Sequence, residues 1–150
     1  MTSTPQRTPR QVMETYLMEV VTNGRLDLIE ELAQPDMVDE ANQAFNGPPG
    51  RAGLVAHAKG FRRNISDASV TVNEIVAGED AVMAKWTFTG KLVGPWLGQT
   101  PTGNEFSCTA FSFFRLRDGL IDHYRVWLHA NLDTPVVFDS ANPQALLAKS

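Results

Sequence analysis

The chain has 150 residues, a formal net charge of −4 and 20% charged residues, which suits one domain with a single core. No basic stripe is present, so the electrostatic footprint of a nucleic-acid-binding protein is missing. The single cysteine, Cys108, excludes an internal disulfide framework and multi-cysteine metal sites. No apolar run approaches the roughly 20 residues of a membrane span, and residues 1–10 lack a signal-peptide core. We therefore expect a cytoplasmic protein that does not enter a membrane.

The first half of the chain predicts three helices. Residues 1–9 are rich in Thr, Pro and Ser and are expected to form a disordered leader. Apolar residues spaced three and four apart predict a helix over 10–22, which Asn23-Gly24 ends. A short helix is predicted over 26–32, before Pro35. A third is predicted over 51–63.

After Asn64 the apolar period changes from 3.6 to 2, which is typical of strands. The predicted strands are 69–77, 81–93, 105–117 and 120–131, with a wide Gly- and Pro-containing loop over 94–104. Asp118-Gly119 predicts a tight hairpin. Helices followed by antiparallel strands predict an α+β domain over 10–139, with the helices packed on a curved sheet. Residues 140–150 are expected to form a weakly ordered tail.

Large apolar side chains occur on both faces of the predicted strands, as with Trp86 on one strand and Phe111 and Phe113 on the next. Both faces of such a sheet need a cover. The helices cover one face, so we expect a second copy of the chain on the other, giving a homodimer. The alternative is a monomer with half-exposed aromatic residues, which is less common.

The sequence contains no local catalytic motif, so the candidates are polar residues on strands. Alternation places Arg125, Trp127 and His129 on one face of the last strand. His129 is a candidate general acid or base, although a single histidine is more often buried and bonded to a backbone carbonyl. Lys85 could polarise a substrate carbonyl or lie with its stem along the rim of a cavity.

Other candidates lie outside the strands. Asp36 and Asp39 follow the second helix and could supply a base to an enclosed cavity, although such clusters more often belong to solvated loops. Tyr16 lies on the apolar face of the first helix, as a core residue or a donor. His57 is expected at the surface. Trp96, in the 94–104 loop, is expected to fold back as a lid over a pocket.

Several segments, in order and at matching spacing, make the chain similar to a known family. They are NGRLDLIEEL (23–32), PPGRAG (48–53), VAGEDAV (76–82), GPWLGQTPTG (94–103) and FRLRDGLI (114–121). The chain resembles the SnoaL-like polyketide cyclases, within the nuclear-transport-factor-like α+β cone superfamily. This resemblance implies a cone with an internal cavity, three N-terminal helices on a strongly curved sheet, a dimer through the sheet, and no metal or cofactor. It also implies a bulky, apolar, polyketide-like substrate.

The resemblance does not extend to the usual site residues. The family's catalytic aspartate position on the last strand falls at His129, and a frequent histidine position falls at Leu92. Related epoxide hydrolases carry an arginine and an aspartate where this chain has Lys85 and Thr87. We therefore predict a cyclase of antibiotic-type biosynthesis that closes a ring mainly by folding its substrate in an apolar cavity, with 4+2 cycloaddition as one such reaction. The predicted substrate-binding residues are Tyr16, Trp86, Leu92, Trp96, Phe111, Phe113, Arg125 and Trp127, with His129, Lys85 and Asp39 as catalytic candidates.

Two alternatives stay open. One is an acid–base aldol or oxa-Michael cyclase that uses His129 with Asp39 or Asp36, for which a bell-shaped pH–rate profile is expected. The other is a non-catalytic protein that binds an apolar metabolite without turnover.

Overall fold

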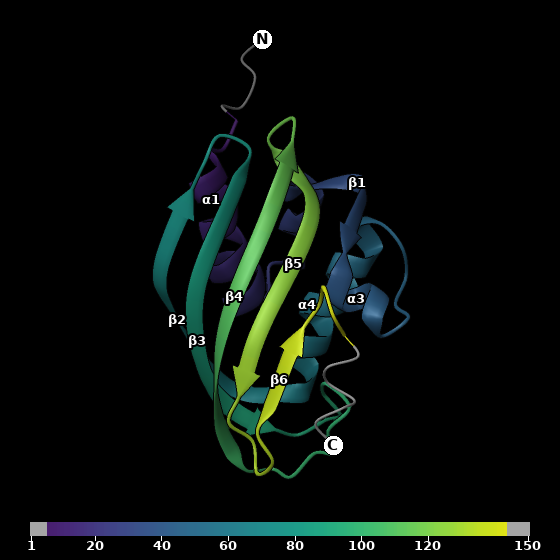
Figure 1. The fold of residues 1–150 in the computed structure, drawn as a ribbon, viewed down its shortest axis with the longest axis vertical. Helices are drawn as coiled ribbons and strands as arrows, with labels where there is room; N and C mark the ends of the chain where they lie inside the picture. Colours follow the sequence, from purple (N-terminus) through teal and green to yellow (C-terminus); the bar gives the residue numbers. More distant parts are fainter. Residues whose placement is uncertain (1–5, 144–150) are drawn as a thin grey trace.

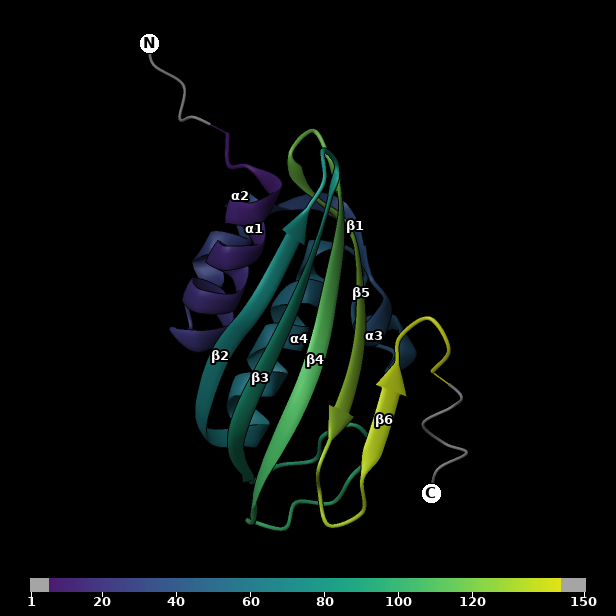
Figure 2. The ribbon, with the colours of Figure 1, turned by 60° about the vertical axis from the view of Figure 1, so that its left-hand side comes forward.

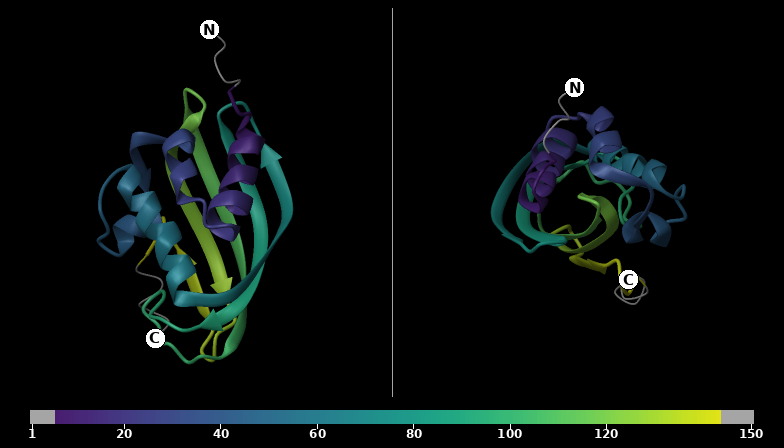
Figure 3. Two further views of the ribbon diagram at one scale, coloured as in Figure 1. Left: turned by 180° about the vertical axis from the view of Figure 1, so that it is seen from behind. Right: turned by 90° about the horizontal axis from the view of Figure 1, so that it is seen from above.

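A six-stranded, mostly antiparallel sheet frames the molecule, which a computed structural model describes for residues 6–143 (Figure 1). Its strands are β1 (Ala33–Asp39), β2 (Ile65–Ala77), β3 (Ala81–Leu92), β4 (Glu105–Arg117), β5 (Leu120–Ala130) and β6 (Val136–Asp139). The strand order is β1-β5-β4-β3-β2, β6 also pairs with β5, and β1 runs parallel to β5. The sheet curves around the helices without closing (Figure 3). The predicted α+β class is confirmed.

The helices lie on the concave side of the sheet (Figure 2). They are α1 (Pro9–Thr15), which continues as a π-helix (Tyr16–Thr22), a 3-10 turn (Leu26–Leu28) joined to α2 (Ile29–Leu32), α3 (Glu40–Ala44) and α4 (Arg51–Asn64). In the π-helix, the Thr22 hydroxyl donates to the carbonyl of Leu17 at 2.7 Å. Gly24, with φ +77°, ends this helix as predicted.

Three short elements differ from the sequence prediction. The segment that holds Asp36 and Asp39, expected to be a loop, forms strand β1, and helix α3 follows it. A sixth strand follows Pro135 and pairs with β5. Elements of four to seven residues carry too few periods for an apolar repeat to stand out. Of the predicted leader and tail, residues 1–5 and 144–150 lie outside the described part.

A bulge in β5 decides which of its side chains face the helices. At the predicted hairpin, Asp118 and Gly119 both have positive φ, and Leu116 pairs with Ile121. The next pair is Arg115 with His123, so Asp122 is an extra residue in β5. Beyond it, the even-numbered residues of β5 face inward.

The core lies between the helices and the concave face. On β3, on β4 and on β5 beyond the bulge, the buried residues are even-numbered, among them Val82, Ala84, Trp86, Phe88, Phe106, Cys108, Ala110, Ser112, Phe114, Tyr124, Val126 and Leu128. The convex face instead carries partly exposed apolar groups, among them Met83 and Trp127, which are 43% and 39% exposed. In residues 6–143, no helix has the length and apolarity needed to cross a membrane.

Candidate functional site

A carboxylate and an imidazole form a pair in the interior. Asp39 ends β1, and only 1% of its side chain is exposed. Its Oδ1 accepts a hydrogen bond from the backbone N–H of Asn42 at 3.1 Å. Its Oδ2 lies 2.7 Å from Nδ1 of His57 on α4. This contact assigns a proton to Nδ1 and leaves Nε2 as the basic nitrogen of the neutral ring.

The charge of Asp39 controls the titration of His57. Burial alone lowers the pKa of the imidazole, but the negative charge of Asp39 and its hydrogen bond outweigh burial and raise that pKa. His57 keeps 27% of its side chain exposed, and within the described residues its Nε2 makes no hydrogen bond. A raised pKa and an unoccupied Nε2 suit a general base.

A line of hydrogen-bonding side chains continues from this pair across the concave face. The ring of Tyr124 stacks on His57, with centroids 5.5 Å apart and planes 15° apart. Ser112 Oγ lies 3.0 Å from the Tyr124 hydroxyl and accepts a hydrogen bond of 3.0 Å from Trp86 Nε1. These contacts join three adjacent strands and fix the orientation of the Tyr124 phenol.

Tyr16, from the π-helix, completes the group. Its ring meets the rings of Tyr124 and Phe114 edge-on. Burial raises the pKa of the Tyr16 and Tyr124 phenols above their ordinary value; the neighbouring Tyr124 and then Asp39 raise it further at Tyr16, and the charge of Asp39 does so at Tyr124. Both phenols are therefore protonated at neutral pH.

An aromatic layer lies one turn of α4 beyond His57. The ring of Phe61 is 4.9 Å from that of Phe88 and 6.3 Å from that of Trp86. Trp96 folds back from the 94–104 loop onto Phe88 and Phe106, at 5.9 and 5.7 Å. This contact agrees with the expected direction of Trp96, while its action as a lid stays a prediction.

A cleft of about 220 Å³ opens beside this layer, lined by Val21, Thr22, Phe61, Arg62, Ile65, Ser66, Asp67, Ala68 and Val70. An enclosed cavity between helices and sheet stays a prediction. No group of three His, Cys, Asp or Glu side chains suited to a metal ion occurs within residues 6–143.

The structure divides the candidates named from sequence into two groups. Tyr16, Asp39, Trp86 and Leu92 are buried on the helix side of the sheet. Lys85, Phe111, Phe113, Arg125, Trp127 and His129 lie on the convex side.

The alternative in which His129 acts together with Asp39 is therefore contradicted, because the two side chains lie on opposite sides of the sheet. His129 pairs with Thr109 and Val137 on an exposed face, because the bulge at Asp122 reverses the facing of β5. Lys85 is adjacent to Trp86, so alternation turns it outward. Asp36 is exposed and pairs with Arg117 at 2.7 Å.

His57 is the functional candidate that sequence reasoning missed, because it was expected at the surface. A signal was present: His57 falls three residues after Leu54 and four before Phe61, and both are buried. Positions three and four apart share one face of a helix. That face packs on the sheet.

The comparisons with known proteins agree with this architecture. The family model of SnoaL-like polyketide cyclases matches residues 11–131. The chain belongs to this family. Aklanonic acid methyl ester cyclase AcmA of Streptomyces galilaeus is 24% identical to this SnoaL-like chain over 113 residues, which span 74% of the chain and 78% of AcmA.

Two solved structures are similar in fold to this SnoaL-like protein. TsrD of Streptomyces laurentii has a TM-score of 0.67 and 24% identity, covering 79% of this chain and 86% of TsrD. IdmH of Streptomyces antibioticus has a TM-score of 0.63 and 26% identity, covering 95% of this chain and 99% of IdmH. The predicted family resemblance is confirmed.

Proposed function

We propose that this protein is a polyketide cyclase that closes a ring by general acid–base catalysis, with His57 as the base. The family match and the relation to AcmA support a polyketide cyclase role. The observation that carries the mechanism is the 2.7 Å contact between Asp39 and Nδ1 of His57. It turns a half-buried imidazole into an oriented base.

In the proposed reaction, Nε2 of His57 takes a proton from a substrate carbon that lies between two carbonyl groups. The resulting enolate carbon attacks the carbon of another carbonyl group, farther along the same molecule. This step forms the ring bond and an alkoxide. His57 then returns the proton to the alkoxide oxygen. Asp39 stabilises the intermediate imidazolium, and the phenols of Tyr16 and Tyr124 donate hydrogen bonds to the enolate oxygen.

The proposed substrate is a bulky, largely apolar polyketide with an acidic C–H group. The aromatic layer around Phe61, Phe88 and Trp96 supports an apolar partner. The name of AcmA gives a methyl ester as the substrate of that relative, and we propose the same class here. Holding the substrate in a folded conformation contributes to the rate. The sequence predicted catalysis by this folding alone, and the His57–Asp39 pair adds proton transfer to it.

The first test compares His57→Asn with His129→Asn, using aklanonic acid methyl ester as the probe. We expect His57→Asn to lower kcat by about 10²- to 10⁴-fold, with a much smaller effect of His129→Asn. In D₂O, wild-type protein should exchange the acidic C–H of the probe faster than His57→Asn does. Equal rates for wild type and His57→Asn contradict acid–base catalysis and favour closure by folding alone, and tight binding without turnover favours a binding protein.

We also propose that the convex face binds a second copy of the chain. A shallow pocket of about 300 Å³ there is lined by Met83, Phe111, Phe113, Arg115, Arg125, Trp127 and Asp139. A two-fold contact across this pocket buries its aromatic centre on both protomers. Light scattering should show a wild-type dimer, a Trp127→Arg monomer and a dimeric Glu79→Arg control. A monomeric wild type contradicts the proposal.

A further inference from the structure

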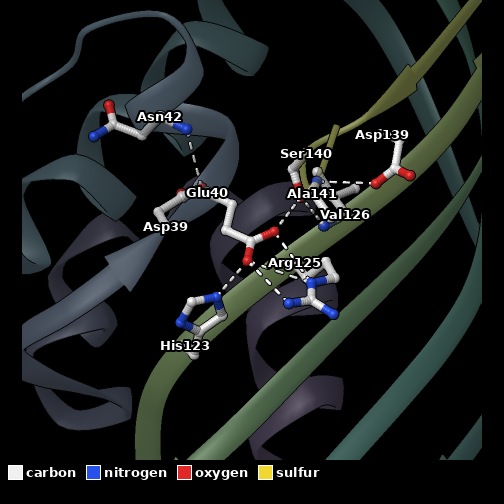
Figure 4. Close-up of polar contacts among 9 residues, drawn as sticks. All are labelled: Asp39, Glu40, Asn42, His123, Arg125, Val126, Asp139, Ser140 and Ala141. Atoms are coloured by element: carbon white, nitrogen blue, oxygen red, sulfur yellow. Dashed lines mark hydrogen bonds and ion pairs between the residues drawn. The ribbon is translucent and has the colours of Figure 1, made fainter. Parts of the chain in front are cut away.

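A second polar cluster lies beside the Asp39–His57 pair, on the outer side of the same chain segment (Figure 4). We call it the Glu40 cluster: the Glu40 carboxylate with His123 and Arg125 of β5 and Ser140, which follows β6. Oε2 of Glu40 lies 2.5 Å from Nε2 of His123, and Oε1 accepts hydrogen bonds from Ser140 Oγ at 2.9 Å and from Arg125 Nε at 3.2 Å. One carboxylate therefore connects α3 to two strands.

Asp39 and Glu40 are consecutive, but their side chains point to opposite sides of the sheet edge. The backbone is extended at Asp39, with φ −104° and ψ 106°, and becomes helical at Glu40. Asp39 turns inward to His57, while Glu40 turns outward to His123 and Arg125 (Figure 4). A single peptide unit thus joins the two residues that carry these carboxylates.

The backbone alone holds this segment at few points. In the described chain, β1 pairs with β5 alone, and its register is interrupted between Ala33 and Val38. The helix that follows has only five residues. Besides the Arg117–Asp36 ion pair, the Glu40 cluster adds a second lateral attachment through charge-assisted hydrogen bonds.

The Glu40 cluster is suited to act as a firm attachment. Glu40 keeps only 14% of its side chain exposed. Burial raises the pKa of its carboxyl, but the bonds from Arg125, His123 and Ser140 outweigh burial and lower that pKa, so the group stays ionised. Ser140 is itself fixed, because its Oγ accepts a 2.9 Å hydrogen bond from the backbone N–H of Val126.

We propose that Glu40 is a positioning residue for the acid–base reaction, which holds Asp39 against His57 and makes that alignment depend on the C-terminal strand β6 through Ser140. The inference rests on the proposed function of His57. Glu40 does not touch the reacting atoms; it acts through the backbone that it shares with Asp39.

The test is the Glu40→Gln variant, with Glu14→Gln as the matched control. Glu14 lies on α1 and pairs with Arg10 at 3.9 Å, with 49% of its side chain exposed, so its loss removes an exposed ion pair on a different element from Asp39. The readout is an NMR titration of His57, identified by the signal missing in His57→Asn. The titratable groups that contact the ring are Tyr124 and Asp39, and Tyr16 packs edge-on against Tyr124.

We expect Glu40→Gln to lower the pKa of His57, because Asp39 moves away while burial stays. We expect kcat for aklanonic acid methyl ester to fall about tenfold, with a smaller change in KM. Ser140→Ala should change both quantities in the same direction by less. Glu14→Gln should match wild type.

An unchanged His57 titration and kcat in both Glu40→Gln and Ser140→Ala overturn the proposal. If Glu40→Gln does not fold, Arg125→Gln gives the same measurement, since Arg125 is 53% exposed and its loss leaves Glu40 in place. The titration needs no substrate. A wild-type protein inactive on the probe therefore counts against the proposed function alone.

Discussion

Asp39 and Tyr124 are direct partners across the parallel β1–β5 ladder, and both contact His57. Asp39 reaches the ring edge at 2.7 Å, and Tyr124 stacks on the ring face. The pairing of Asp39 with Tyr124 in the sheet therefore places both the carboxylate partner of His57 and a phenol beside the imidazole. A site on paired strands is held in geometry before a substrate arrives, which favours catalysis.

The Asp39→Asn variant tests the role of the carboxylate charge. An amide keeps the size of the side chain but cannot neutralise the imidazolium, so we expect kcat to fall by about 10²- to 10⁴-fold. The pKa of His57 should fall as well, because burial then dominates. Steady-state kinetics and NMR titration measure the two effects. Asp27→Asn, which removes a carboxylate that is 70% exposed, is the control, and equal losses in both variants contradict the assignment.

The stability of the protein should depend on pH through His57. Asp39 raises the pKa of His57 in the folded chain, so the folded state binds this proton more tightly than the unfolded state. The resulting stabilisation is complete below the unfolded pKa of about 6.5 and is lost as the pH rises through the folded value. Urea unfolding should show that the difference in free energy of unfolding between wild type and His57→Gln shrinks above about pH 6.5. A difference that grows with pH contradicts this.

The stability of the protein at acidic pH should depend on Glu40. Its pKa is lowered in the folded chain, so its stabilisation is present above the unfolded pKa of about 4.3 and is lost as the pH falls through the folded value. The difference in stability between wild type and Glu40→Gln should therefore shrink as the pH falls. Thermal unfolding between about pH 3 and pH 7 measures this, and a constant difference over that range is the contrary result.

Ser112 should matter more to stability than its size suggests. It is fully buried, and Ser112→Ala removes the partner of both Trp86 Nε1 and the Tyr124 hydroxyl. Leaving buried polar groups unpaired costs about 1–3 kcal/mol, which denaturant unfolding should detect. Ser107→Ala, on the exposed face of the same strand, should change the free energy of unfolding by less than about 0.5 kcal/mol. Similar values for the two variants argue against the hydrogen-bonded chain.

The long elements could be predicted from the sequence because each carries several apolar periods. The predicted strand 105–117 coincides with β4, and helix α4 extends one residue beyond the predicted 51–63. Short elements could not be found this way. Strands β1 and β6 are stabilised by pairing with β5, a long-range contact that leaves little local pattern.

The site was only partly predictable for a related reason. Asp39, Tyr16 and Trp86 were identified as candidates, and all three face the interior. His129 and Trp127 were placed on the wrong side, because the sequence pattern does not reveal a bulge. His57 was overlooked, since the adjacent polar residues of α4 suggested a solvated face.

The extra residue Asp122 also affects how relatives are compared. A gap placed a few positions away in β5 would set the outward-facing residues of this chain, such as His129, in the same alignment columns as inward-facing residues of a homologue. Catalytic roles copied along such columns would be assigned to the wrong side chains throughout the last long strand. Alignments of this family should therefore be anchored on the Leu116–Ile121 and Arg115–His123 pairs before any residue of β5 is compared.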